Sequence, residues 1–356
     1  MPDLAGLPVA VDAMGGDRAP GEIVAGAFQA AKELGVAVLL IGDPACLTGT
    51  EAVPGVDFEA ASEVVGMDED PGRAVRLKRD SSLVRCAEAV AQGRACAMVS
   101  AGNTGAAMAS ALLRMGRLPG VSRPAIATTI PVPSSTPTVL IDSGANVDCT
   151  APMLVQFAQM GWALAIERFG IADPRVGLLS IGEEDTKGNA LVKEAHGLFA
   201  AGAAGPQVRF MGNVEGRDVM SDRVDVVVTD GFTGNVVLKT LEGGVKAVVG
   251  GVIGALTSTD EIKEAARAVM PALAPLASEL DPDTYGGAVL LGVNGVCVIS
   301  HGSSSARAIV NAIKVAHHAV RERLVERVEA AVASGTASGA ASGEAPAAQR
   351  RASPVG

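Results

Sequence analysis

Short apolar runs that end in loops of small polar residues recur along this chain, and no other feature restricts its fold as strongly. Val9–Met14 begins as an apolar run and leads into the turn Gly15–Pro20. Glu22–Leu34 then has helical spacing, and Ala37–Ile41 is a second apolar run. Strand, helix and strand at this spacing form a βαβ unit, which requires a parallel sheet. The sequence therefore predicts an α/β fold.

The same arrangement returns through the rest of the chain. Ala151–Phe169 is a long expected helix, and a closing helix ends near Val328. Further expected strands, each followed by a polar loop, are Ala95–Ser100, Thr138–Asp142, Val176–Ser180, Val208–Met211, Val224–Thr229 and Val293–Ser300. Ligands bind at the carboxyl ends of the strands in such sheets. We therefore expect several loops to meet at one crevice, where backbone N–H groups suit a phosphate or an oxyanion.

One of these loops, Ser180–Asn189, brings a cation to a strand end. Lys187 lies between Gly182 and Gly188, and Asn189 begins a segment with helical spacing. Free N–H groups at a helix N-terminus favour an anion. Lys187 and these amides are therefore candidates to hold a phosphate, although a solvated strand-to-helix loop has the same pattern.

The composition argues against several other classes of protein. A net charge of −10 and an aromatic content of 3% disfavour nucleic-acid binding. The five cysteines form no CxxC pair, so neither a zinc site nor a disulfide framework is indicated, and a reducing cytoplasm fits. The sequence has neither a GxxxxGK nor a GxGxxG motif, which disfavours P-loop kinases and standard dinucleotide enzymes.

The longest uncharged stretches and the chain ends predict a soluble domain with a tail. The first residues lack the basic and apolar regions of a signal peptide, and Gly or Pro residues interrupt the uncharged stretches 95–113 and 124–141. From Ala331 the sequence is rich in Ala, Gly, Ser and Pro without periodicity. We expect one domain over residues 1–330 and a disordered tail over 331–356.

Seven loop motifs together resemble one family, the bacterial phosphate acyltransferases of phospholipid synthesis. They occur in order from residue 9 to about residue 320, so the resemblance covers the chain except for the tail. Each motif is weak alone, but the series is highly specific. The motifs are Val11–Pro20, Ser100–Gly105, Asp142–Asp148, Ile181–Asn189, Gly212–Asp218, Thr229–Asn235, and Tyr285–Gly287 with Ser300–Ser304.

The resemblance implies a reaction, a fold and partners. The reaction is transfer of a long-chain acyl group from acyl carrier protein to inorganic phosphate, and a glycerol-3-phosphate acyltransferase would consume the acyl phosphate. The implied fold is a three-layer α/β/α sandwich with a mostly parallel sheet, similar to the phosphotransacetylase and isopropylmalate-dehydrogenase group, in a homodimer. The resemblance implies no metal and no cofactor. It also implies a cytoplasmic enzyme with peripheral contact at the inner face of the membrane.

The resemblance and the chemistry together indicate site residues. Phosphate already carries an anionic oxygen, so the protein must place it against the thioester, stabilise an oxyanion and help the thiolate leave. We expect Lys187, Asn189 and His301 to be catalytic, with His301 protonating the thiolate. The expected substrate-binding residues are Asp12, Gly15, Gly16, Asn103, Thr104, Asp142, Asn146, Asp230, Thr233 and Asn235.

Several of these residues have a second interpretation. The aspartates could orient neighbouring loops instead of touching substrate, and the asparagines could cap helices or fit left-handed turns. His301 could be an ordinary hydrogen-bonded loop histidine. An acyl-cysteine intermediate at Cys96 or Cys149 is conceivable, but a buried inert thiol is the more common state, and we expect that state here.

A basic segment stands out in this acidic chain. Its five cations have one local acid, Asp80, and their spacing places several on one side of a helix. An acyl carrier protein is a small acidic domain, so we expect this segment to dock it. An ordinary solvated helix face is the alternative. The five residues are Arg73, Arg76, Lys78, Arg79 and Arg85.

Residues 257–283 depart from the family pattern. Family members often carry a basic apolar segment there, which is linked to membrane association. This chain keeps an apolar stripe but has only Lys263 and Arg267 against six acidic residues. We therefore expect weak electrostatic attraction to a membrane.

Three other functions remain open from the sequence. A short-chain phosphotransacetylase that uses coenzyme A is the nearest. A metal- and NAD-dependent decarboxylating dehydrogenase of similar fold is weaker, and a nicotinamide absorbance assay would separate it. A non-catalytic scaffold for lipid-synthesis enzymes belongs to another class, and it predicts no turnover of acyl carrier with phosphate.

Overall fold

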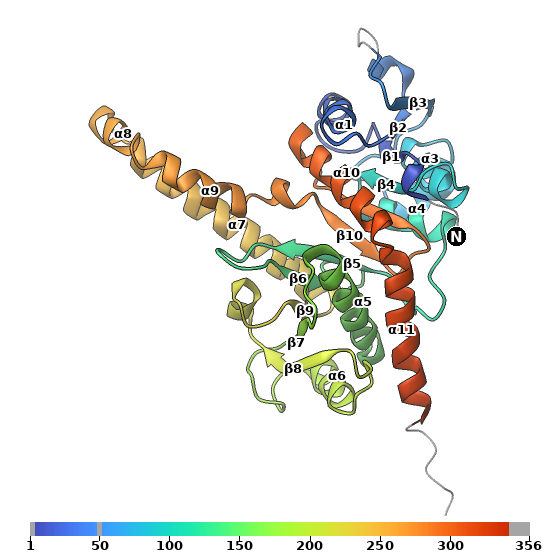
Figure 1. The fold of residues 1–356 in the computed structure, drawn as a ribbon, viewed down its shortest axis with the longest axis vertical. Coiled ribbons are helices and arrows are strands. Elements are labelled where there is room, and N and C mark those ends of the chain that lie inside the picture. Colours follow the sequence, from blue (N-terminus) through green and yellow to red (C-terminus); the bar gives the residue numbers. More distant parts are fainter. Residues whose placement is uncertain (1–3, 48–51, 342–356) are drawn as a thin grey trace, which may run out of the picture.

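One sheet of 11 strands, with helices on both faces, forms the centre of the molecule (Figure 1). The structure is a computed structural model that describes residues 4–47 and 52–341. The strand order is β3-β2-β1-β4-β11-β10-β5-β6-β9-β7-β8. The strands are β1 (Val9–Asp12), β2 (Val38–Gly42), β3 (Val56–Ala60), β4 (Ala97–Ser100), β5 (Ala125–Ile130), β6 (Thr138–Ile141), β7 (Arg175–Leu179), β8 (Arg209–Val214), β9 (Val226–Val228), β10 (Ala288–Leu291) and β11 (Val296–Ile299).

Most helices follow a strand and cover the sheet, as the βαβ pattern predicts. The helices are α1 (Gly21–Leu34), α2 (Pro71–Leu77), α3 (Ser82–Ala91), α4 (Thr104–Arg114), α5 (Ala151–Phe169), α6 (Ala190–Ala200), α7 (Gly231–Leu256), α8 (Asp260–Ala266), α9 (Met270–Leu280), α10 (Ala306–Arg321) and α11 (Leu324–Ala341). Helices α1 and α5 both end at a glycine in the left-handed conformation, Gly35 and Gly170, where a side chain would be strained.

Two groups of parallel strands run in opposite directions through the sheet. Strands β3, β2, β1, β4 and β11 are parallel to one another, and so are β6, β9, β7 and β8. Between them, β10 pairs antiparallel with β11 and with β5, and β5 pairs antiparallel with β6. Three reversals leave the carboxyl ends of the two groups at opposite edges of the sheet. The expectation of one crevice is therefore wrong, because the antiparallel strands β10 and β5 reverse the strand direction between the two groups.

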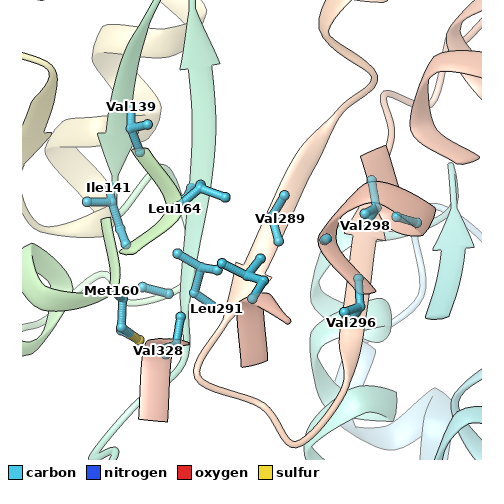
Figure 2. Close-up of a cluster of buried hydrophobic side chains, with 14 of the residues drawn as sticks. Val139, Ile141, Met160, Leu164, Val289, Leu291, Val296, Val298 and Val328 are labelled. Carbon is cyan, nitrogen blue, oxygen red and sulfur yellow. The ribbon is translucent and has the colours of Figure 1, made fainter. Parts of the chain in front are cut away.

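The core fills both faces of the sheet because successive strand residues point to opposite sides. Residues of one alternation pack under α1, α5, α6, α10 and α11. Those of the other alternation pack under α3 and α4 in one half and under α7 in the other. Figure 2 shows the first layer continuing across the antiparallel centre, where Ile141, Leu291 and Val298 lie with Met160 and Val328. The expected α/β/α sandwich with a mostly parallel sheet is confirmed.

The carboxyl-terminal end of the fold differs from the sequence expectation. The closing helix is two helices, α10 and α11, separated near Arg323, whose φ is 58°. Helix α11 continues to Ala341 and packs against α5, so the expected tail does not begin at Ala331. Val328 and Val332 are each 1% exposed, and their burial holds α11 against the core. The alanines of α11 also favour a helix. The rest of the expected tail, residues 342–356, lies outside the described residues.

Helices α7, α8 and α9 project from the body as an arm (Figure 1). Large apolar side chains stay exposed along it, among them Val248 (67%), Val252 (47%) and Ile262 (42%). Within residues 4–47 and 52–341, none of the helices combines the length and the apolarity needed to cross a membrane.

Candidate active site

The loops after β1 and β4 are tied together around the buried carboxylate of Asp12, which is 2% exposed. Its Oδ1 accepts hydrogen bonds from Ser82 Oγ (2.6 Å) and from the Met14 amide (3.2 Å), and its Oδ2 accepts from Ser100 Oγ (2.7 Å). Burial raises the pKa of the Asp12 carboxyl. Because the protein's own donors occupy both oxygens, we propose that Asp12 positions these loops and does not touch substrate.

Gly15 and Gly16 allow the β1 loop to approach its neighbours. A Cβ on Gly15 would lie 2.4 Å from Asp12 Oδ2, and a Cβ on Gly16 would lie 3.0 Å from the carbonyl oxygen of Gly302. Gly16 also has a φ of 111°, which residues with a side chain rarely adopt. The Asp17 amide donates to the Gly302 carbonyl at 2.8 Å. The β1 loop is therefore held against the loop after β11, which carries His301.

Asn103 connects the end of β4 to the segment before α2. Its Oδ1 caps α4 by accepting from the Ala106 amide at 3.0 Å. Its Nδ2 donates to the carbonyls of Met67 (3.0 Å) and Glu69 (3.2 Å). Thr104 is exposed at the first position of α4. This side chain thus brings the basic segment next to the β4 and β11 loops.

A second buried carboxylate, Asp142, organises the loop after β6 at the other edge of the sheet. It is 0% exposed, and its Oδ1 accepts from the amides of Ile126 (3.0 Å), Gly144 (3.1 Å) and Ala145 (2.9 Å). Its Oδ2 accepts from the backbone (2.7 Å) and side-chain (2.9 Å) nitrogens of Asn146. Burial raises the pKa of the Asp142 carboxyl. We assign the same loop-positioning role to it as to Asp12.

The loop after the neighbouring strand, β9, starts α7. Asp230 caps this helix by accepting from the amide (2.9 Å) and hydroxyl (2.8 Å) of Thr233. Gly231 packs tightly against the loop after β6, since its amide donates to the Asn146 carbonyl at 2.7 Å. Asn235 is exposed, and its Cβ would be 3.7 Å from a Cβ on Gly144. Asn235 is therefore the expected residue of this loop that remains open to a substrate.

Lys187 and Asn189 lie in the loop after β7, the strand next to β9. Asn189 caps α6 by accepting from the Val192 amide at 2.9 Å, as its position predicts. Asn213 anchors the loop by donating to the Glu184 carbonyl at 2.8 Å. Lys187 is exposed, and within the described part of the chain its ammonium has no hydrogen bond or ion pair. The cation is therefore free to hold an anion.

Apolar side chains surround this edge of the sheet. Val147 follows β6, Phe232 and Val236 follow β9, and Ile181 follows β7, so the four come from three adjacent strand ends. Their exposed fractions are 64%, 62%, 50% and 82%. Exposed apolar side chains gathered at one place indicate a binding surface. These side chains lie at the same end of the strands as the loops that carry Lys187 and Asn235.

Helix α7 connects the two edges. It begins at the β9 edge and covers one face of the sheet through its inward residues Val237, Leu238 and Leu241. Lys239 then reaches the other edge, where its Nζ lies 3.0 Å from Nε2 of His301. Sequence reasoning missed Lys239. Its position four residues after Asn235, on the same side of an expected helix, was the available signal.

Other chemistries find little support in the described residues. Burial raises the pKa of Cys96 and of Cys149 to about 11, so both thiols are protonated at neutral pH and poor nucleophiles. Within residues 4–47 and 52–341, no cluster of three His, Cys, Asp or Glu side chains is placed to hold a metal ion.

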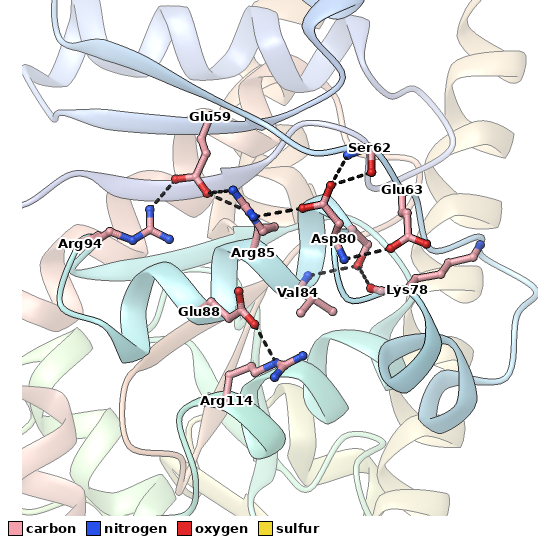
Figure 3. A network of polar contacts seen from close by, with 11 residues as sticks. Glu59, Ser62, Glu63, Lys78, Asp80, Val84, Arg85, Glu88, Arg94 and Arg114 are labelled. Atoms are coloured by element: carbon pink, nitrogen blue, oxygen red, sulfur yellow. Dashed lines mark hydrogen bonds and ion pairs between the residues drawn. The ribbon is translucent and has the colours of Figure 1, made fainter.

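The basic segment is less free than its sequence suggested. Lys78 is ion-paired with Glu69. Arg85 pairs with Glu59 and Asp80 (Figure 3). The interpretation that Asp80 is the only acid nearby is therefore wrong, because the fold also brings Glu69 to Lys78 and Glu59, 26 positions away, to Arg85. Within the basic segment, the cations that stay exposed without an ion pair to the described residues are Arg73, Arg76 and Arg79, beside Leu77, which is 67% exposed.

Comparisons with known proteins identify the relatives of this chain. Residues 7–327 match the family model described as "Fatty acid synthesis protein". The chain is 48% identical over 325 residues to the phosphate acyltransferase of Heliobacterium modesticaldum, covering 90% of this chain and 96% of that protein. It is 47% identical over 324 residues to the phosphate acyltransferase of Pelotomaculum thermopropionicum, with 90% and 93% covered.

Solved structures resemble the chain in fold. A phosphotransacetylase from Streptococcus pyogenes matches with a TM-score of 0.60 at 19% identity, covering 89% of this chain and 94% of that one. A branched-chain phosphotransacylase from Enterococcus faecalis matches with a TM-score of 0.55 at 15% identity, covering 88% and 99%. At these identities the likeness extends to the arrangement of strands and helices.

Proposed function

This chain belongs to the fatty acid synthesis protein family, and we propose that it transfers a long-chain acyl group from acyl carrier protein to inorganic phosphate. The chain matches phosphate acyltransferases over nearly their whole length. It is therefore an acyltransferase that uses phosphate as acceptor. The long acyl chain, the carrier and the delivery of acyl phosphate to phospholipid synthesis are the parts that we propose.

The observation that carries this proposal is the set of exposed apolar side chains on the loops next to Lys187 at the same sheet edge. A free ammonium and the amide of Asn235 suit the oxygens of phosphate. The exposed side chains of Val147, Phe232 and Ile181 offer an acyl chain an apolar surface on the same sheet edge. A short acetyl group would have little use for so much exposed apolar area, so the surface favours a long-chain donor.

Direct attack by phosphate fits these residues. A phosphate oxygen attacks the thioester carbonyl, and Lys187 balances the charge of the phosphate while Asn235 supplies a hydrogen-bond donor. A covalent acyl-enzyme is unnecessary, and the two cysteines nearest the strand ends have pKa values of about 11. Asn189, whose side chain is used as a helix cap, acts through the loop that presents Lys187.

The carrier would dock at Arg73, Arg76 and Arg79. Their positive charge complements an acidic carrier domain, and the exposed Leu77 adds an apolar contact. Asn103 holds this segment against the end of β4. From there, α7 leads across the sheet to Asn235, so the carrier's flexible prosthetic arm could follow the helix toward Lys187.

The test is an assay of the purified full chain with long-chain acyl carrier protein and inorganic phosphate. Acyl phosphate is trapped as the hydroxamate, and free carrier thiol is measured in parallel. We expect both products in equal amounts and none without phosphate. Release of fatty acid with no hydroxamate would contradict the proposal.

A short-chain phosphotransacetylase that uses coenzyme A is the second candidate, because solved phosphotransacetylases share the fold. The same assay with acetyl-coenzyme A distinguishes the two. A higher kcat/KM for acetyl-coenzyme A than for the long-chain carrier substrate would favour this candidate.

We also propose that the arm mediates a homodimer. Gly243, Ala247, Gly250 and Gly254 recur at intervals of three or four residues along exposed α7, which permits close contact with a second helix. Sedimentation of the parent and of Gly250→Glu tests this, with a shift toward monomer expected for the variant. Binding of the same two proteins to anionic vesicles tests the peripheral membrane contact separately.

A further inference from the structure

Two basic side chains from opposite halves of the sheet touch beside the candidate site. Nζ of Lys239, on α7, lies 3.0 Å from Nε2 of His301, in the loop after β11. Lys239 Nζ also lies 2.8 Å from Oε2 of Glu242, and His301 Nδ1 lies 3.1 Å from Oγ of Ser303. The Lys239 and His301 side chains are 50% and 53% exposed, so a substrate can reach both.

This geometry assigns the protons of the pair. An ammonium has three donors and no acceptor, so His301 Nε2 must accept the hydrogen bond from Lys239. A neutral imidazole that accepts at Nε2 carries its proton on Nδ1, which lies 3.1 Å from Ser303 Oγ and 3.5 Å from the Ser303 amide nitrogen. In this arrangement Lys239, and not His301, holds a proton that it can deliver to a substrate. Glu242 takes a second N–H of the ammonium, which leaves the third for a ligand.

Lys239 is also placed between the proposed carrier and phosphate positions. It follows Asn235 by one helical turn, so the two side chains lie on the same side of α7. On the other side of the contact, the β11 loop touches the segment before α2, since a Cβ on Gly302 would lie 2.9 Å from Met67 Cε. A thioester arm that runs from the basic segment toward Asn235 would pass Lys239.

We propose that Lys239 is the acid that protonates the departing thiolate, and that His301 positions it. The inference deepens the proposed function and rests on it. A hydrogen phosphate oxygen forms a bond to the acyl carbon, and the carbon–sulfur bond breaks with its electrons on sulfur. Lys239 gives a proton to the sulfur and then takes up the proton that the phosphate loses. Atoms and charge therefore balance without another reactant.

The experiment compares leaving groups, because an aryl thiolate is stable without a proton and an alkyl thiolate is not. Lys239→Met and the parent are assayed with the same acyl chain on pantetheine and on thionitrobenzoate. We expect Lys239→Met to lose about 100-fold in kcat with the alkyl thioester and less than about 5-fold with the aryl one, as for loss of a general acid. Equal losses with both, or no loss with either, would overturn the proposal.

Two further variants separate position from chemistry. His301→Gln keeps an acceptor for Lys239 and should retain most of the kcat that His301→Ala loses, whereas equal loss in both would return the acid role to His301. Lys246→Met removes another exposed lysine of α7 and should leave kcat unchanged. Thermal unfolding checks that each variant is folded. Absence of hydroxamate product with the parent enzyme would refute the proposed function itself, which is a different result from an active parent with an unimpaired Lys239→Met.

Discussion

Replacing Asp142 by asparagine tests whether a buried carboxylate builds the β6 edge of the site. The substitution conserves shape but changes one acceptor oxygen into an N–H donor. In the folded chain five N–H groups point at this carboxylate, three at Oδ1 and two at Oδ2. The new amide can keep the three bonds at Oδ1. Its new NH₂ group then faces the backbone and side-chain nitrogens of Asn146, which are also hydrogen-bond donors.

The expected cost follows from those two donors. A buried donor without a partner costs about 1–3 kcal/mol, so two would cost about 2–6 kcal/mol. Removing the charge offsets part of this destabilisation, because burial disfavours the charged carboxylate and raises the pKa of Asp142. We expect a net loss of about 3 kcal/mol, a large part of the about 5–15 kcal/mol that stabilises a typical domain.

Urea unfolding followed by far-UV circular dichroism measures the loss, with kcat measured below the transition. The control is Asp222→Asn, because that carboxylate is 74% exposed in its ion pair with Arg175 and should contribute less than about 1 kcal/mol. We expect kcat of Asp142→Asn to fall as well, since Asn146 and its neighbours lose their position. A change below 1 kcal/mol together with normal kcat would refute the positioning role.

The remaining predictions concern the reaction. Lys187→Ala should lower turnover at least tenfold in a folded protein, because charge stabilisation at a phosphate contributes a few kcal/mol; near-normal kcat would remove Lys187 from the mechanism. Cys96→Ala and Cys149→Ala should keep most activity, and mass spectrometry should find no acylated protein without phosphate, since burial raises both thiol pKa values to about 11. Trapping an acyl-enzyme would support a covalent route instead. Changing both Arg73 and Arg76 to Glu should raise KM for the acyl carrier substrate, less so in high salt, with little change in KM for phosphate. A rise in KM for phosphate alone would place these arginines in the anion site.

Local patterns in the sequence were sufficient for the fold class and for several individual caps. Apolar runs with polar loops determine where strands end, and hydrogen bonds at Asn103, Asn189 and Asp230 form within three residues of the cap. Such features depend on neighbours along the chain, so the sequence alone specifies them. The family resemblance likewise rested on loop motifs that are contiguous in sequence.

Tertiary structure decided how those loops are grouped and which side chains remain free. Antiparallel β5 and β10 separate the strand ends into two edges, and α7 rejoins them by bringing Lys239 to His301, 62 positions away. Burial of Asp12 and Asp142, and the ion pairs of Lys78 and Arg85, also depend on distant partners. Strand direction and long-range pairing depend on how the whole sheet packs. A local sequence pattern does not determine which distant residue will become a neighbour.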